Sequence, residues 1–200
     1  MNREGDLILP HGGFRKLRGF AVALAAYDGT VIFCDRFVDK RSRTHDQMVQ
    51  AARSGVQNIA EGSLASGTSK KTELKLTNVA RASLGELIRD YEDYLRQNGL
   101  SIWDKDSRRV RAMRARLAGK LKPDSDRSDR SDRSEFFDEP LLSALCALRS
   151  TGPEICANIL LCLAHQASYL LRRQIERLEQ DFMDKGGFTE RLYQYRKDHR

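Results

Sequence analysis

SGVQNIAEG at residues 54–62 and VARASLGEL at residues 79–87 are the two stretches that decide the fold. Both predict helices that carry polar residues beside apolar ones. At about 3.6 residues per turn, Ser54, Asn58 and Glu61 lie on one side of the first helix. Its apolar residues lie on the other side: Val49, Ala52, Val56 and Ile59. The sequence therefore predicts two inward faces, one apolar and one polar.

The polar face of these two helices needs hydrogen-bond partners. An unsatisfied buried polar group costs about 1–3 kcal/mol, so buried amides and carboxylates are normally paired. We predict a structural polar core that joins the two helices and consists of Arg53, Asn58, Glu61, Arg81, Ser83 and Glu86.

Motifs throughout the chain carry a family resemblance. They are PHGGFRKL at 10–17, DQMVQAARSGVQNIAEGS at 46–63, TSKKTELKLTNVARASLGELIRDYEDYL at 68–95, YLLRRQIERLEQDF at 169–182 and GGFTERL at 186–192. They resemble the four-helix-bundle suffix-domain proteins of the 23S rRNA intervening-sequence family. That family is similar to the accessory variability determinant that works beside the reverse transcriptase of diversity-generating retroelements. The match covers nearly the whole chain except about residues 104–140.

The resemblance implies a closed helical bundle, rings of five subunits, and nucleic-acid binding as in the accessory proteins. It implies no reaction. Gly85 departs from the pattern, because relatives carry a larger residue at this place in the helix. A glycine inside a helix costs about 1 kcal/mol against alanine, so the loss is either tolerated or used for close packing.

The periodicity of apolar residues predicts an all-α, antiparallel, up-and-down four-helix bundle. Its helices are expected at about 14–38, 45–62, 69–98 and 154–184, with a short helix at 140–149. The first three bundle helices fill residues 14–103, an insertion fills 104–139, and the short helix and fourth bundle helix fill 140–184. Residues 1–13 form an N-terminal arm and 185–200 a C-terminal tail.

Composition indicates a soluble protein of one domain. The 200 residues are 40% hydrophobic and 32% charged, with a net charge of +7. The beginning, MNREGDLILPHGG, predicts neither a secretory signal nor a transit peptide, so we expect a cytoplasmic protein. The four cysteines lie in apolar runs without paired spacing, as core thiols in a reducing compartment would.

The last helix is apolar nearly all round between residues 155 and 171, with five successive apolar residues at 159–163. A helix with one buried stripe would not need this pattern. We expect one side to contact the helix's own bundle and the other a neighbouring subunit in a homo-oligomer. Membrane insertion is the alternative, but Asn158, His165, Gln166 and Ser168 interrupt the run.

The insertion is the most basic part of the chain. Residues 105–122 hold eight basic residues and one acidic residue, Asp106. An amphipathic helix is expected at 106–121. The threefold serine-aspartate-arginine repeat at 125–133 is too polar to bury anything, so the insertion is expected to be partly disordered.

Basic residues on three helices predict a surface that binds RNA or DNA through phosphates. The candidate nucleic-acid-binding residues are Arg15, Lys16, Arg18, Lys71, Lys75, Arg89, Arg96, Lys105, Arg108, Arg109, Arg111, Arg114, Arg116, Lys120 and Lys122. No aromatic residue lies within the basic segment 105–122, and only Trp103 comes just before it, so base stacking is not expected. The leading hypothesis is an adaptor that presents nucleic acid to a protein such as a reverse transcriptase. The alternative is a protein–protein scaffold whose charges only solvate an exposed face.

The sequence predicts no catalytic site, metal site or cofactor. No histidine follows a glutamate by three residues, as a two-metal carboxylate site requires, and no phosphate-binding glycine loop is present. Cys162 and His165 are three apart but lack further ligands. A third hypothesis is an enzyme that uses Glu61 with Glu86 or Asp90 as acid and base.

Overall fold

The structure of the chain is a computed structural model that describes residues 13–117, 136–186, 192–193 and 196–197. Every regular element within this part of the chain is helical, which confirms the all-α prediction. The elements are the 3-10 helix η1 (Phe14–Lys16) and the α-helices α1 (Arg18–Phe37), α2 (Arg43–Ala65), α3 (Lys70–Gln97), α4 (Arg108–Leu117), α5 (Glu139–Ser150) and α6 (Pro153–Lys185).

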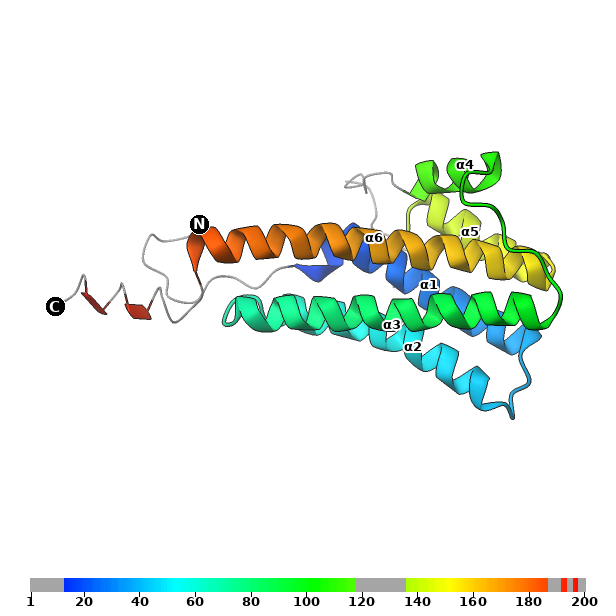
Figure 1. The fold of residues 1–200 in the computed structure, drawn as a ribbon, viewed down its shortest axis with the longest axis horizontal. Coiled ribbons are helices and arrows are strands. Elements are labelled where there is room, and N and C mark those ends of the chain that lie inside the picture. The colour runs from blue at the N-terminus through cyan, green and yellow to red at the C-terminus, as the bar shows by residue number, and fades with distance from the viewer. Residues whose placement is uncertain (1–12, 118–135, 187–191, 194–195, 198–200) are drawn as a thin grey trace, which may run out of the picture.

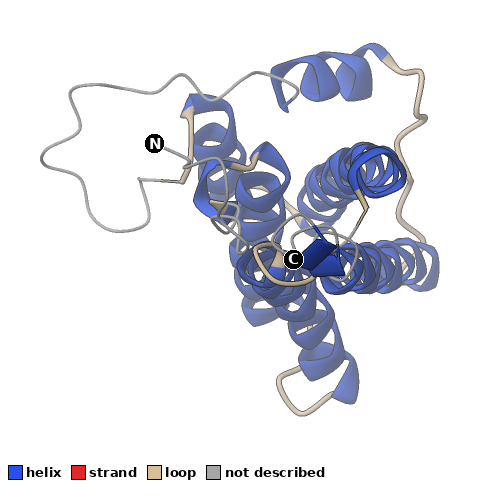
Figure 2. Cartoon of the chain, turned by 90° about the vertical axis from the view of Figure 1, so that its left-hand side faces the viewer, coloured by secondary structure: helices blue, strands red, loops and turns tan. Residues whose placement is uncertain are grey.

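The four long helices, α1, α2, α3 and α6, pack side by side. Each contacts the next around a closed circuit, in which α1 meets α2, α2 meets α3, α3 meets α6 and α6 returns to α1. Their directions alternate along the chain (Figure 1). The short helices α4 and α5 lie outside this group, and in the end-on view α4 lies at the outer edge of the molecule (Figure 2).

Capping residues fix where the helices begin and end. The sequence predicts that Thr44 or Asp46 caps the start of α2. This prediction is wrong, because the Ser42 hydroxyl accepts the hydrogen bond from the Thr44 N–H and caps the helix. The Asp138 carboxylate accepts from the Leu141 N–H at the start of α5. Gly99, just after the end of α3, has a φ of 65°, a left-handed conformation that favours glycine.

The expected first helix is interrupted near its beginning. Leu17 is extended, with φ −81° and ψ 120°, and separates η1 from α1. The sequence predicts an inward apolar stripe on this helix made of Leu17, Ala21, Leu24, Tyr27, Val31 and Cys34. Three of these residues, Leu24, Tyr27 and Val31, are only half-buried. Three elements, α2, α5 and α6, contact α1, so more than one of its faces is covered.

The core contains one buried polar pair. Tyr91 of α3 is fully buried, and its hydroxyl donates a hydrogen bond of 2.9 Å to Thr30 Oγ1 on α1. Thr30 in turn donates to the Ala26 carbonyl at 2.7 Å. Burial raises the pKa of Tyr91 well above its ordinary value, which keeps the hydroxyl protonated as a donor.

Helix α6 is covered by the chain itself. It contacts α3, α1, α4 and α5, and every residue from Cys156 to Ala164 is buried within the single chain. The apolar residues on several sides of α6 are therefore accounted for by contacts within the single chain. By length and composition, residues Pro153–Asp184 also resemble a membrane span, but 67% of the apolar window is buried, as in the core helix of a soluble protein.

Candidate nucleic-acid interface

Helix α4 is fixed to the outside of the long helices by apolar and polar contacts. Val110 and Leu117 are buried beneath it. The chain before α4 is held by Asn158 of α6, which is 2% exposed. Asn158 Oδ1 accepts a hydrogen bond of 2.7 Å from the Trp103 N–H, and Asn158 Nδ2 donates to the Ser101 carbonyl at 2.9 Å. These contacts set the position of α4 on α6.

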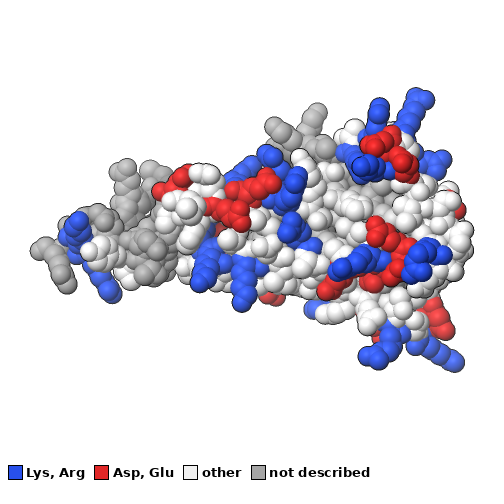
Figure 3. Space-filling model, viewed as in Figure 1, with Lys and Arg blue, Asp and Glu red and all other residues white. Residues whose placement is uncertain are grey.

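The outward side of α4 is densely basic. The helix contains five arginines and no acidic residue, and all five side chains are exposed: Arg108, Arg109, Arg111, Arg114 and Arg116. None forms an ion pair with another described residue. Figure 3 shows basic side chains projecting outward over α4, with acidic side chains beside them. Such cations remain available to bind phosphates.

Two of these arginines are ordered by neighbours of the helix. The Arg109 guanidinium lies 4.7 Å from the centre of the Trp103 ring, in a cation–π contact. Arg114 donates a hydrogen bond of 3.3 Å to the Lys105 carbonyl. Three predictions for the insertion lie outside the described residues. They are the continuation of the helix to residue 121, the cations Lys120 and Lys122, and the repeat at 125–133.

Arg18 is not one of the exposed cations that could bind phosphates. Its side chain is only 13% exposed, and Nη1 lies 2.7 Å from Asp138 Oδ2. Its Nε and Nη2 atoms donate to the Leu117 carbonyl at 3.1 and 2.8 Å. Arg18 therefore ties the end of α4 to the residue that caps α5, a structural role instead of the expected binding role.

We expect Arg18→Gln to lower the free energy of unfolding by about 1–2 kcal/mol, because charge-assisted hydrogen bonds to a half-buried carboxylate and a carbonyl are lost. Chemical denaturation followed by circular dichroism measures the change. Lys16→Gln removes the same charge from an exposed side chain nearby and should change stability by less than about 0.5 kcal/mol. Equal stability of the two variants would contradict the structural role of Arg18.

The predicted cations of η1 and α3 lie apart from α4, whereas Lys105 is exposed just before it. Arg15 and Lys16 on η1 are exposed, and the Arg15 guanidinium lies 5.4 Å from the centre of the Phe136 ring. On α3 the cations Lys71, Lys75, Arg89 and Arg96 are all exposed. Arg96 Nη2 lies 2.6 Å from Asp93 Oδ1, so its charge is compensated locally.

The predicted polar core between α2 and α3 is smaller than expected. Ser54 and Ser83 share a hydrogen bond of 3.0 Å across the two helices, and Asn58 Nδ2 donates to the Ser54 carbonyl at 2.9 Å. The four charged members are exposed at the surface: Arg53, Glu61, Arg81 and Glu86. Exposed long side chains reach water, so they need no protein partners.

An acidic groove lies beside this serine pair. It has a volume of about 670 Å³, and Asp46, Glu86 and Asp90 line it with Arg43. Burial and the neighbouring charges of Glu86 and Asp93 raise the pKa of Asp90. Glu61, the expected partner in a carboxylate pair, is not among the residues that line the groove.

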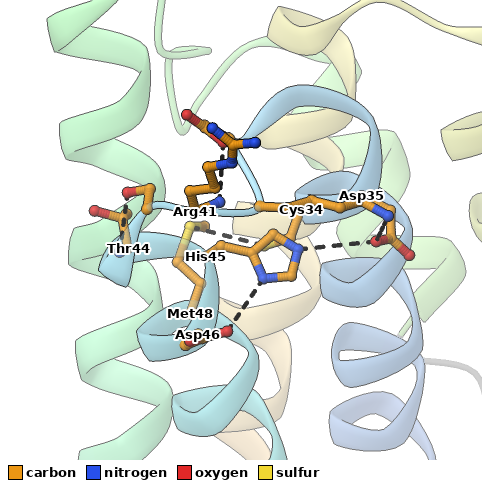
Figure 4. Close-up of polar contacts among 10 residues, drawn as sticks. Cys34, Asp35, Arg41, Thr44, His45, Asp46 and Met48 are labelled. Atoms are coloured by element: carbon orange, nitrogen blue, oxygen red, sulfur yellow. Dashed lines mark hydrogen bonds and ion pairs between the residues drawn. The ribbon is translucent and has the colours of Figure 1, made fainter.

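A second titratable cluster joins α1 to α2 (Figure 4). His45 lies between two carboxylates, with Nε2 3.8 Å from Asp35 Oδ1 and Nδ1 3.5 Å from Asp46 Oδ1. The nearby Cys34 Sγ contacts Met48 Sδ at 4.0 Å. Burial raises the pKa of the Cys34 thiol to about 12, so at neutral pH this sulfur is a protonated core atom and not a nucleophile.

The other thiols and possible metal ligands are scattered. Cys146 on α5 is exposed, contrary to the expectation that all four cysteines lie in the core, and Cys162 is buried while His165 is exposed. Although His165 is exposed at the surface, partial desolvation of its ring by neighbouring side chains, with a smaller effect of the Arg114 charge, lowers its pKa. Among the residues that the structure describes, no three His, Cys, Asp or Glu side chains are grouped to hold a metal ion.

The fold and surface thus define an all-helical protein with a basic helix fixed to its outer edge. No family model, curated protein or solved structure matches the chain. Two anchoring residues, Trp103 and Asn158, escaped prediction as parts of this surface. Their signal in the sequence was weak, because Asn158 is a single amide within an apolar run and Trp103 stands outside every periodic segment.

Proposed function

We propose that this protein is a four-helix-bundle adaptor that binds RNA or DNA through α4, without a reaction of its own. The observation that carries the proposal is the set of five exposed arginines on α4, none of them in an ion pair within the described chain. A solvated helix face normally pairs its cations with acids one turn away, which α4 does not do.

The rest of the proposal has separate support. The circuit of contacts among α1, α2, α3 and α6, with alternating directions, supports the proposed up-and-down bundle. The resemblance to the intervening-sequence and suffix-domain proteins supports a homo-oligomer of five subunits and a reverse transcriptase as protein partner, and the composition supports a cytoplasmic location. Several copies of α4 on one oligomer would strengthen individually modest phosphate contacts by avidity.

Salt dependence tests the binding proposal. Fluorescence anisotropy with short labelled RNA and DNA should show binding at about 50 mM salt that weakens steeply toward about 200 mM, because cations that meet phosphates release counterions. Replacing Arg108 and Arg111 together by alanine should reduce the slope of log affinity against log salt by about two.

A matched variant controls for net charge. Arg53 and Arg81 are exposed on α2 and α3, away from α4, so replacing both with alanine should leave the slope unchanged. Absence of binding at about 50 mM salt would overturn the proposed function. Equal slopes for the two double variants would show that α4 is not the interface.

A further inference from the structure

A groove runs between α4 and α5, and apart from Arg109 and Arg116 it is lined by residues that the basic-surface proposal does not use. Its volume is about 300 Å³. The lining positions recur at three- and four-residue steps on both helices, from 109 to 116 on α4 and from 140 to 147 on α5. This spacing places them on one face of each helix, so the groove follows both helices.

The floor and walls of the groove are mostly apolar. Ile159 of α6 and Ala144 of α5 are buried residues that line it, and Met113 and Pro140 add apolar side chains from α4 and α5. Trp103 also contributes to the lining. A shallow apolar slot of this kind fits a flat aromatic group better than a phosphate.

Positive charge is found on one wall only. Arg109 and Arg116, both on α4, line the groove, and no acidic residue does so among the residues described. The Arg109 guanidinium already stacks on the Trp103 ring, at 4.7 Å. An apolar groove with one tryptophan ring beside guanidinium groups that form no ion pair with a described residue complements a ligand that joins a planar ring to negative charge, as a nucleotide does.

We propose that this groove takes one unpaired base of a single-stranded nucleic acid, while Arg109 and Arg116 bind the flanking phosphates. The proposal rests on the proposed function and narrows its substrate class. In a duplex the bases are paired and stacked inside, so only an unpaired strand can place a base in the slot. The sequence alone favoured phosphate contact without base stacking, because Trp103 lies outside the basic helix in the chain.

Trp103 makes the test direct, because it is the only tryptophan of the chain. The intrinsic fluorescence of the full chain is titrated with oligo(dT) and oligo(U) of about 12 nucleotides, within the size range of a single-strand site. The same titration uses a duplex and an abasic DNA strand of equal length. Both single strands should quench the fluorescence, and the duplex and the abasic strand should quench it little. DNA and RNA that differ in quenching would identify the preferred strand.

A pair of alanines on α4 supplies the variant and its control. Ala112 lines the groove, whereas Ala115 does not, and both are exposed. Ala112→Leu fills the slot and should weaken single-strand binding about fivefold or more, the loss expected for one stacked base. Ala115→Leu should bind as the unchanged protein does, and duplex binding should be equal in both variants.

The two proposals fail in different ways. Binding of every oligonucleotide with equal quenching by the abasic strand, or equal single-strand affinity of the two leucine variants, would overturn the base pocket and leave the proposed function standing. A preference for the duplex would do the same. Binding of none of the nucleic acids would overturn both.

Discussion

Replacing Asn158 with leucine is expected to lower the free energy of unfolding by about 2–3 kcal/mol. The amide joins α6 to the segment before α4 through the Trp103 N–H and the Ser101 carbonyl. Leucine has a similar size but offers neither a donor nor an acceptor. The Trp103 N–H is then left without its partner in a half-buried position, and an unsatisfied group of this kind costs about 1–3 kcal/mol.

The loss of the Asn158 hydrogen bonds should also disturb the proposed interface. Trp103 carries the stacked Arg109 and lines the groove, so releasing its backbone from Asn158 displaces both. We expect the Asn158→Leu protein to retain its helical circular dichroism and to lose the quenching of Trp103 by single strands. The sequence suggests only that Asn158 interrupts an apolar run, whereas the structure shows what it binds.

Denaturant unfolding and the fluorescence titration measure these two effects. Asn78→Leu provides the matched control, because Asn78 is exposed on α3 and lies outside the groove. It should change stability by less than about 0.5 kcal/mol and leave quenching intact. If Asn158→Leu and Asn78→Leu behave alike, Asn158 does not hold the segment before α4.

Much of the helical pattern could be predicted from periodicity and capping signals. The third long helix was expected at 69–98 and spans Lys70–Gln97, and the last was expected at 154–184 and spans Pro153–Lys185. Asn98-Gly99 in the sequence predicts the end of α3 and Pro153 predicts the first turn of α6, and the two helices end and begin at these residues. These signals are local, so a single sequence is enough to detect them.

The surroundings of α6 could not be predicted in the same way. An all-round apolar helix is equally consistent with a subunit contact and with burial by short helices of the same chain. The structure places α4 and α5 against α6, but α4 lies within the insertion and α5 comes at its end, and no periodic pattern specifies the path of the insertion. Long-range contacts of this kind depend on tertiary packing and leave no spacing in the sequence.

The candidate site could be predicted only in part, because the contacts of its residues also depend on tertiary packing. The arginines of α4 are exposed, as a polar face requires. Arg18 has an identical side chain but a partner 120 positions away, at Asp138, so its role is set by the fold. Helical periodicity alone predicts that the charged members of the polar core lie inside. Long side chains at the edge of a contact between two helices instead extend outward to water.

Two glycines show that the sequence does not reveal which glycine is needed for close packing. Gly85 departs from the family pattern in the sequence, yet a Cβ there would meet nothing within 4 Å. Gly29 of α1 carries no such signal, yet its Cβ would lie 2.6 Å from Leu160 Cδ2 and 2.7 Å from Leu148 Cδ1. Both leucines are fully buried, so neither can move away without displacing the core between α1, α5 and α6.

Alanine at these two positions should therefore act in opposite directions. Gly85→Ala should raise the free energy of unfolding by about 0.5–1 kcal/mol, since alanine favours a helix and fits the open space. Gly29→Ala should lower it by about 1–2 kcal/mol, because overpacking costs about 1–3 kcal/mol and exceeds the same helical gain. Thermal and urea unfolding of the two variants measure the difference, with α-helix content checked by circular dichroism. A Gly29→Ala protein as stable as Gly85→Ala would show that α1 does not approach α5 and α6 as closely as these distances require.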